Sequence, residues 1–181
     1  VDESGTTDTF TIVLDAQPAS DVVISLAIDD AGEATVTSTL SFTAATWDTP
    51  QTVTVTGVDD DLIDGTQSST ITISIIDAIS DNSFDDVADQ TVSVSTTDDD
   101  VAGFTVDELD GSTEVDESGT TDTFTVVLDA QPTSNVVITL SSNDGSEISI
   151  PSSLTFTSAN WDTAQTVTVT GVDDSVIDGT I

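Results

Sequence analysis

The sequence predicts an all-β protein made of two antiparallel β-sandwiches in tandem. Apolar residues alternate with Thr, Ser and other polar residues in short runs, which is the period-two pattern of half-buried strands. Turn-forming clusters such as DAQPAS and DDAGE separate these runs. The whole pattern then returns 114 residues later. No stretch has the 3.6-residue period of a convincing amphipathic helix.

The repeat is close to identical at its ends. VDESGTTDTF at residues 1–10 recurs unchanged at 115–124, and QTVTVTGVDD at 51–60 recurs at 165–174. Without a gap, 46 of the 67 aligned positions are identical. A repeat of this length is a whole domain rather than one coil of a solenoid, so the chain is expected to be a string of domains.

The predicted strands of the first repeat follow one another at short intervals. Seven or so strands with this spacing, joined by turns, are typical of an immunoglobulin-like antiparallel β-sandwich. Their alternating apolar residues, in chain order, are Phe10, Ile12 and Leu14; Val22, Ile24, Leu26 and Ile28; Leu40 and Phe42; Val53 and Val55; Ile71, Ile73 and Ile75; and Val92 and Val94.

The junction between the repeats is predicted at DDDVAGFTVDE, residues 98–108. A new strand is expected to begin there, over Ala102 to Val106. We therefore expect one sandwich over 1–100 that lacks its first strand and another over 101–181 that lacks its last strands. These strands would come from a longer repetitive chain or from neighbouring molecules.

The charge balance limits the possible partners. The chain has 35 Asp and Glu but no Lys, Arg or His. Nucleic acid and anionic membranes are disfavoured, because binding to phosphate depends on basic side chains. Two carboxylates about 4 Å apart repel by roughly 1 kcal/mol in water and roughly 4 kcal/mol near a protein surface, so dissolved cations, high salt or protons must compensate crowded acids.

The same composition makes an enzyme improbable. There is no His, Cys, Lys, Arg or Tyr to act as base, nucleophile or oxyanion clamp. A carboxylate pair can hydrolyse a glycoside, but that chemistry needs an apolar cleft and aromatic platforms, and only Trp47 and Trp161 are available as large platforms. Their equivalent places in the two repeats favour a packing role. We expect no catalytic activity.

The loop VDDDLIDGT, residues 58–66, favours a hard cation. Ca²⁺ takes 6 to 8 oxygen ligands with flexible geometry, and Asp-rich loops supply such oxygens. An EF-hand reading beginning at Asp60 fails, because its third position is Leu62 and its twelfth is Ile71. The ligands of a calcium ion must therefore converge from several loops.

In their order along the chain, VDESG, QTVTVTG with VDDDLIDGT, and TTDDD resemble the Calx-beta family and the related tandem β-sandwich repeats of large bacterial surface adhesins. The resemblance implies Ca²⁺ ions at one end of each sandwich, near the joint with the next domain. It implies ligands at Glu3, Asp59, Asp60, Asp61, Asp64, Asp98, Asp99 and Asp100, and at Glu117, Asp173, Asp174 and Asp178. A further acid would be Asp29 or Asp30, and Asp144 in the second repeat. Ser175 replaces Asp61 there, which implies fewer ions or weaker binding.

Two plainer readings of the acidic turns stay open. Asp and Gly make good turns and keep a surface soluble. Adaptation to high salt is the main competitor, but it predicts acids spread evenly over the surface rather than bunched at the ends of motifs.

The expected function is a calcium-stabilised structural repeat of an extracellular bacterial adhesin or surface filament, acting as a rigid extender. Its partners would be neighbouring repeats of the same chain, in one molecule or in a homopolymer. Two alternatives stay open. One is a self-assembling fibre or sheath subunit completed by strands from neighbours, and the other is a calcium-dependent carbohydrate-binding module.

Overall fold

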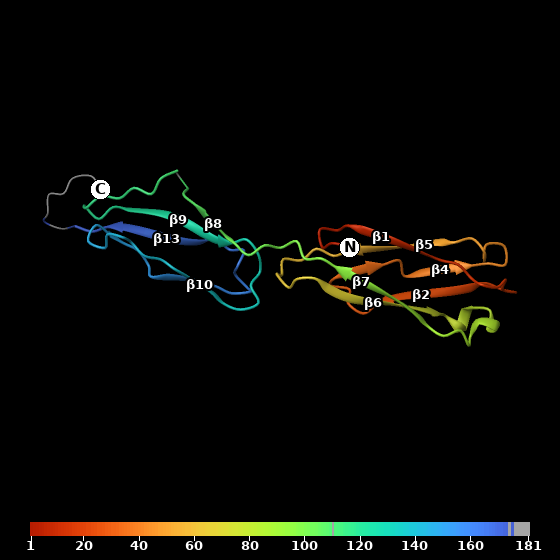
Figure 1. Ribbon diagram of the computed structural model, residues 1–181. Helices are drawn as coiled ribbons and strands as arrows, with labels where there is room; N and C mark the ends of the chain where they lie inside the picture. Colours follow the sequence, from red (N-terminus) through yellow and green to blue (C-terminus); the bar gives the residue numbers. More distant parts are fainter. Residues whose placement is uncertain (110, 174, 176–181) are drawn as a thin grey trace. The chain divides into compact units, whose positions relative to one another are not determined.

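The computed structural model describes residues 1–109, 111–173 and 175, and it confirms the all-β sandwich fold (Figure 1). Every pair of strands within its sheets is antiparallel. The described residues contain no helix long and apolar enough to cross a membrane. The chain divides into two compact units, Val1–Asp60 with Asp64–Asp99, and Asp61–Ile63 with Asp100–Ile181.

The first unit packs a three-stranded sheet against a four-stranded sheet. The three-stranded sheet has the order β1-β5-β3, with β1 at Thr7–Ile12, β5 at Gln51–Gly57 and β3 at Ala34–Val36. The four-stranded sheet has the order β4-β2-β6-β7, with β4 at Thr39–Phe42, β2 at Val22–Ile28, β6 at Gln67–Ile75 and β7 at Gln90–Thr96.

The alternation in the sequence is what builds this core. In β2, for example, Val22, Ile24 and Leu26 are buried while the residues between them are more exposed. Strands of this kind contribute every second side chain to the interior. Two polar residues, Ser69 of β6 and Thr96 of β7, are buried as well. The fully buried apolar members from both sheets are Val22, Ala34, Phe42, Val53 and Ile71, and the partly buried Trp47 packs against the cluster.

The second unit repeats five of these strands at the same offset. Its sheets have the orders β11-β13-β9-β8 and β10-β12. The strands are β8 at Phe104–Asp107, β9 at Thr121–Leu128, β10 at Val136–Thr139, β11 at Ile148–Ser149, β12 at Ser153–Phe156 and β13 at Gln165–Gly171. The register is kept, since Thr123 faces Thr168 just as Thr9 faces Thr54.

Three local features depart from the expected elements. The short strand β3 was not predicted, because ATV is too brief to show an alternating pattern. The strand at the junction begins at Phe104, two residues later than expected, after Gly103. The connection between β6 and β7 contains two single-turn 3₁₀ helices, η1 at Asp77–Ile79 and η2 at Asn82–Phe84.

A candidate metal centre

The VDESG turn is held against the end of β5 by its backbone. A Cβ atom on Gly57 would overlap the carbonyl group of Asp2, so only glycine lets the two segments lie this close. The Asp2 carboxylate accepts bonds from Ser4 N at 3.0 Å and from Thr97 Oγ1 at 2.9 Å. Glu3 N donates to the carbonyl oxygen of Thr97 at 3.0 Å. The QTVTVTG and VDESG motifs therefore act together to fix Glu3 beside the end of β7.

Glu3 is the most unusual acid in the first unit. Its side chain is only 1% exposed. Neither of its carboxylate oxygens has a hydrogen-bond partner among the described residues. Burying an ionised carboxylate without a partner costs many kcal/mol, so such groups are protonated, paired or bound to a metal.

Other carboxylates come from the loops before β3, after β5 and after β7. Glu33 precedes β3 and is 8% exposed, with its Oε2 atom also unpartnered among the described residues. Its carbonyl oxygen accepts Val58 N at 3.0 Å, which fastens the loop to the end of β5. Gly65 N donates to Asp98 Oδ2 at 2.7 Å and so draws the VDDDLIDGT loop toward the end of β7.

The electrostatics of the cluster oppose ionisation. Burial, followed by the charges of Asp60, Asp98, Glu33 and Asp64, raises the pKa of Glu3 to about 7. Burial also raises the pKa of Glu33, and the charges of Asp64, Asp30 and Asp60 add to the rise. Near neutral pH the Glu3 carboxyl group therefore needs either a proton or a bound cation.

The arrangement has the chemistry of a hard-cation site. Carboxylate oxygens of Glu3, Asp98 and Asp100 lie within 4.8 Å of one another, close enough to share one ion. Oxygen is the ligand atom that Ca²⁺ and Mg²⁺ prefer. Among the residues that the structure describes, no protein donor binds the buried Glu3 oxygens and would have to be displaced by a cation. The donor set therefore fits a calcium ion.

The structure brings together some of the acids named from the sequence. Those gathered around Glu3, by contact distance or by charge, are Asp60, Asp64, Asp98 and Asp100. Asp59, Asp61 and Asp99 have exposed side chains and are not among them. The Asp29 carboxylate accepts a hydrogen bond from Thr70 N of β6 at 2.7 Å, and the Asp30 carboxylate accepts one from Gly32 N of its own loop at 3.0 Å. The charge of Asp30 also acts on Glu33.

Glu33 is the residue that the sequence reasoning missed. It follows Asp29 and Asp30, and the sequence predicted one of these two acids as the ligand from this loop. A signal was present, because residues 31–40 are the least similar part of the repeat and yet Glu33 has an identical counterpart in Glu147. A charged residue kept in a variable stretch is a sign of a specific role.

The second unit reproduces the scaffold of this centre. A Cβ atom on Gly171 would overlap the Asp116 carbonyl group, and Val172 N donates to the carbonyl oxygen of Glu147 at 2.8 Å. Glu117 and Glu147 are half-buried, and Asp173 is exposed. The Asp144 carboxylate accepts hydrogen bonds from the hydroxyl group and the backbone N–H of Ser146, and these bonds lower the pKa of Asp144. Asp174 and Asp178 lie outside the described residues.

Fold and centre together define a tandem antiparallel β-sandwich with carboxylates gathered around Glu3, after the end of β7. No protein-family model matches the chain, and no curated protein does. Similar solved structures include the calcium binding domain CBD12 of CALX1.1, at 14% identity and TM-score 0.40, covering 96% of this chain and 72% of that one. CBD12 from CALX1.2 is also similar, at 14% identity and TM-score 0.36, and the match covers 98% of this chain and 73% of that one. SSP-19 from Caenorhabditis elegans, an MSP-domain protein like family member, has 15% identity and TM-score 0.34, and the match covers 52% of this chain and 86% of that one.

Proposed function

We propose that this chain is a calcium-stabilised structural repeat of an extracellular bacterial adhesin or surface filament, in which it acts as a rigid extender. The observation that carries the calcium part is Glu3, a carboxylate that is 1% exposed and has no hydrogen-bond partner for either oxygen among the described residues. A chain without Lys, Arg or His can neutralise that charge only with protons or dissolved cations.

Calcium fits the centre better than magnesium. Mg²⁺ demands near-ideal octahedral geometry and keeps several waters, whereas Ca²⁺ accepts a larger and less regular set of carboxylates. Glu3, Glu33 and Asp98 come from three separate loops, and Glu3 is only 1% exposed to solvent. We therefore expect selectivity for Ca²⁺ over Mg²⁺.

The structural part of the proposal follows from where the ligands lie in the chain. Asp98 and Asp100 stand directly after β7, the last strand of the first unit. An ion bound to both Glu3 and these residues restrains the segment that leads out of the sandwich. Calcium would thereby make the chain stiffer and give it the reach that a surface extender needs. No catalytic role is proposed, because the centre offers carboxylates alone.

A carbohydrate-binding module is less well supported. Sugar binding calls for exposed aromatic rings on a concave face. Trp47 and Trp161 are instead half-buried and pack against the two hydrophobic cores. They serve the packing of the sandwich.

Calorimetric titration of chelator-treated protein with Ca²⁺ tests the proposal. We expect saturable binding that survives 0.15 M NaCl and 1 mM Mg²⁺. We also expect NMR relaxation to show a smaller amplitude of backbone motion at residues 98–100 when Ca²⁺ is bound. Binding that Mg²⁺ or NaCl at the same ionic strength abolishes would overturn the calcium assignment. Saturable binding that leaves the linker equally mobile would overturn the extender role alone.

A further inference from the structure

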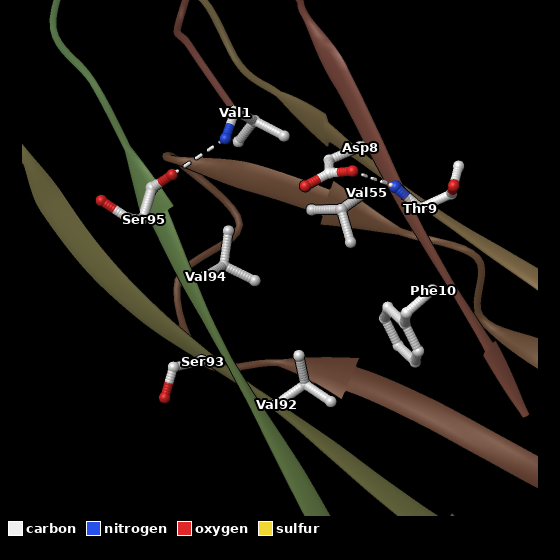
Figure 2. A pocket seen from close by; sticks show the side chains of 9 residues that line it. All are labelled: Val1, Asp8, Thr9, Phe10, Val55, Val92, Ser93, Val94 and Ser95. Atoms are coloured by element: carbon white, nitrogen blue, oxygen red, sulfur yellow. Dashed lines mark hydrogen bonds between the residues drawn. The ribbon is translucent and has the colours of Figure 1, made fainter.

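The outer edge of β1 in the first unit has no strand paired with it among the described residues. β1 is the end strand of the order β1-β5-β3. An edge strand presents unpaired N–H and C=O groups that can accept another strand. A cavity of about 290 Å³ adjoins this edge, lined by Phe10 of β1, Val55 of β5 and Val92 and Val94 of β7 (Figure 2).

The second unit shows what occupies the equivalent edge there. β9 is the counterpart of β1, since residues 121–124 repeat residues 7–10 letter for letter. β8 pairs with the outer edge of β9, antiparallel, with Phe104 opposite Leu128 and Val106 opposite Val126. Opposite residues of an antiparallel pair lie on the same face of the sheet, so Phe104 and Val106 share a face with the buried Leu128 and Val126, although about half of each side chain is exposed.

Polar contacts fix β8 at its beginning. Asp129 N donates to the carbonyl oxygen of Gly103 at 3.0 Å, and Thr105 Oγ1 donates to Asp129 Oδ1 at 2.9 Å. A Cβ atom on Gly103 would overlap the Asp129 carboxylate, so a larger residue there would have to displace that side chain. The counterpart of Asp129 in the first unit is Asp15, whose side chain is exposed.

A second polar contact lies further along the same edge. Asp122 accepts Thr123 N at 2.7 Å with one oxygen and Glu114 N at 2.7 Å with the other. Its counterpart Asp8 lines the cavity and accepts Thr9 N at 2.7 Å through Oδ1. Figure 2 shows this bond with the Asp8 carboxylate beside the cavity. Asp8 thus stands where its counterpart receives a backbone N–H from the segment that follows β8.

We propose that the outer edge of β1, with Asp8, Asp15 and the adjoining cavity, binds an extended peptide of the kind formed by residues 101–114. The peptide adds to the sheet as a strand antiparallel to β1. It brings glycine and threonine to Asp15, places two alternate apolar side chains on the core side, and donates a backbone N–H to Asp8. This inference does not depend on metal binding.

The repeat also predicts the register of the bound peptide. With the pairing of β8 and β9 moved back by 114 residues, Phe104 stands opposite Leu14 and Thr105 opposite Val13. Amides at alternate positions of a strand point to the same side. Because Leu14 N donates to Trp47 O, the amides of Thr11, Val13 and Asp15 point to the open edge.

Hydrogen exchange of the full chain with a synthetic peptide of residues 101–114 tests the proposal. The experiment runs in EDTA, so that metal binding has no influence, and in 0.5 M NaCl, because protein and peptide are both acidic. We expect saturable binding and slower exchange of the amides of Thr11, Val13 and Asp15. The matched control is the same peptide with Thr105→Pro, which keeps the charge but loses a paired N–H and should bind at least about tenfold more weakly.

Two protein variants complete the test. Val13→Pro removes an outward N–H just past the end of β1 and should abolish peptide binding, and Asp15→Ala removes the contact to threonine at an exposed position and should weaken binding. Equal protection by both peptides, protection confined to β9, or no saturable binding would overturn the proposal. Protection of β1 that grows with protein concentration and that the peptide does not compete with would also overturn it, since a second copy would then be the occupant.

Discussion

Glu3 is the residue on which the metal centre depends. The substitution Glu3→Gln keeps the size of the side chain and removes its charge. We expect Ca²⁺ affinity to fall by at least about tenfold, as losses of even outer-shell partners do. In EDTA the variant should be at least as stable as the parent protein, because a buried, repelled charge is gone.

Asp48→Asn is the matched control for that substitution. It makes the same change of charge at an exposed position in the connection between β4 and β5. Titration calorimetry and thermal unfolding of both variants give the comparison. If Asp48→Asn weakens Ca²⁺ binding as much as Glu3→Gln does, net charge rather than a specific site controls the affinity.

The raised pKa of Glu3 predicts how pH acts on the metal-free protein. Its pKa is about 7 in the fold, above the ordinary value of 4.5. A raised pKa means that the folded state holds the proton more tightly, so its contribution to stability is full below pH 4.5 and is lost as pH rises through 7. In EDTA, the parent protein should therefore lose stability relative to Glu3→Gln between pH 4.5 and 7.

The same proton links pH to calcium. Below pH 7 the ion must displace a proton from Glu3, so binding should release protons and the apparent affinity should rise with pH and then level off above 7. Calorimetry in two buffers of different ionisation enthalpy measures the release. An affinity that is flat from pH 5.5 to 8 contradicts the placement of Glu3 among the ligands.

At the scale of elements, Gly57 joins β5 to the turn that carries Glu3. Gly57→Ala forces the Asp2 carbonyl group away from the strand, and overpacking of this kind costs about 1–3 kcal/mol. We expect a lower melting temperature and weaker Ca²⁺ binding, although no ligand is changed. Gly145→Ala is the control, since a Cβ atom there meets nothing within 4 Å. Equal effects of the two substitutions would show that the close approach is unimportant.

Asp81 connects the turn before η2 to the segment before β2. Its carboxylate accepts Ala19 N at 2.6 Å, Ser20 N at 2.9 Å and Ser83 N at 2.9 Å, and these bonds lower its pKa to about 2. Asp81→Asn should lower the melting temperature at neutral pH. The bonds are divided between both carboxylate oxygens, whereas Asn has a single, neutral acceptor oxygen and an NH₂ group that cannot accept an N–H.

The pH dependence of that substitution has the opposite sign to that of Glu3. A lowered pKa gives stability that is present above the ordinary value of 3.8 and is lost as pH falls toward 2. The melting temperatures of parent and Asp81→Asn should therefore converge on acidification. A difference that stays constant down to pH 2 would contradict the role of the ionised carboxylate.

The sequence was sufficient for the longer strands because alternation is a local property, whereas β3 is too short to show it. Val22, Ile24 and Leu26 reveal their strand without knowledge of its neighbours. The centre was only partly predictable, since Glu3 and Asp98 are nearly a hundred residues apart and burial depends on which loops meet. Asp59 and Asp99 have the same chemistry as their neighbours but point into solvent, and Glu33 owes its role to the bond between its carbonyl group and Val58.

For the whole molecule, the central issue is whether its 35 carboxylates are compensated by general screening or at a defined site. General screening depends on ionic strength alone, because it acts on all exposed charges together. A site that binds the folded state stabilises it further as ligand exceeds its dissociation constant, by about 2.7 kcal/mol at a hundredfold excess. The two mechanisms therefore separate when Ca²⁺ and NaCl are compared at matched ionic strength.

Thermal unfolding of the full chain in EDTA, in millimolar Ca²⁺ and in NaCl of equal ionic strength is the most direct test. We predict that Ca²⁺ raises the melting temperature by several degrees more than NaCl does, and that Glu3→Gln removes most of this difference. An equal rise in the two salts, or a calcium-specific rise that Glu3→Gln leaves intact, would contradict a calcium centre built around Glu3.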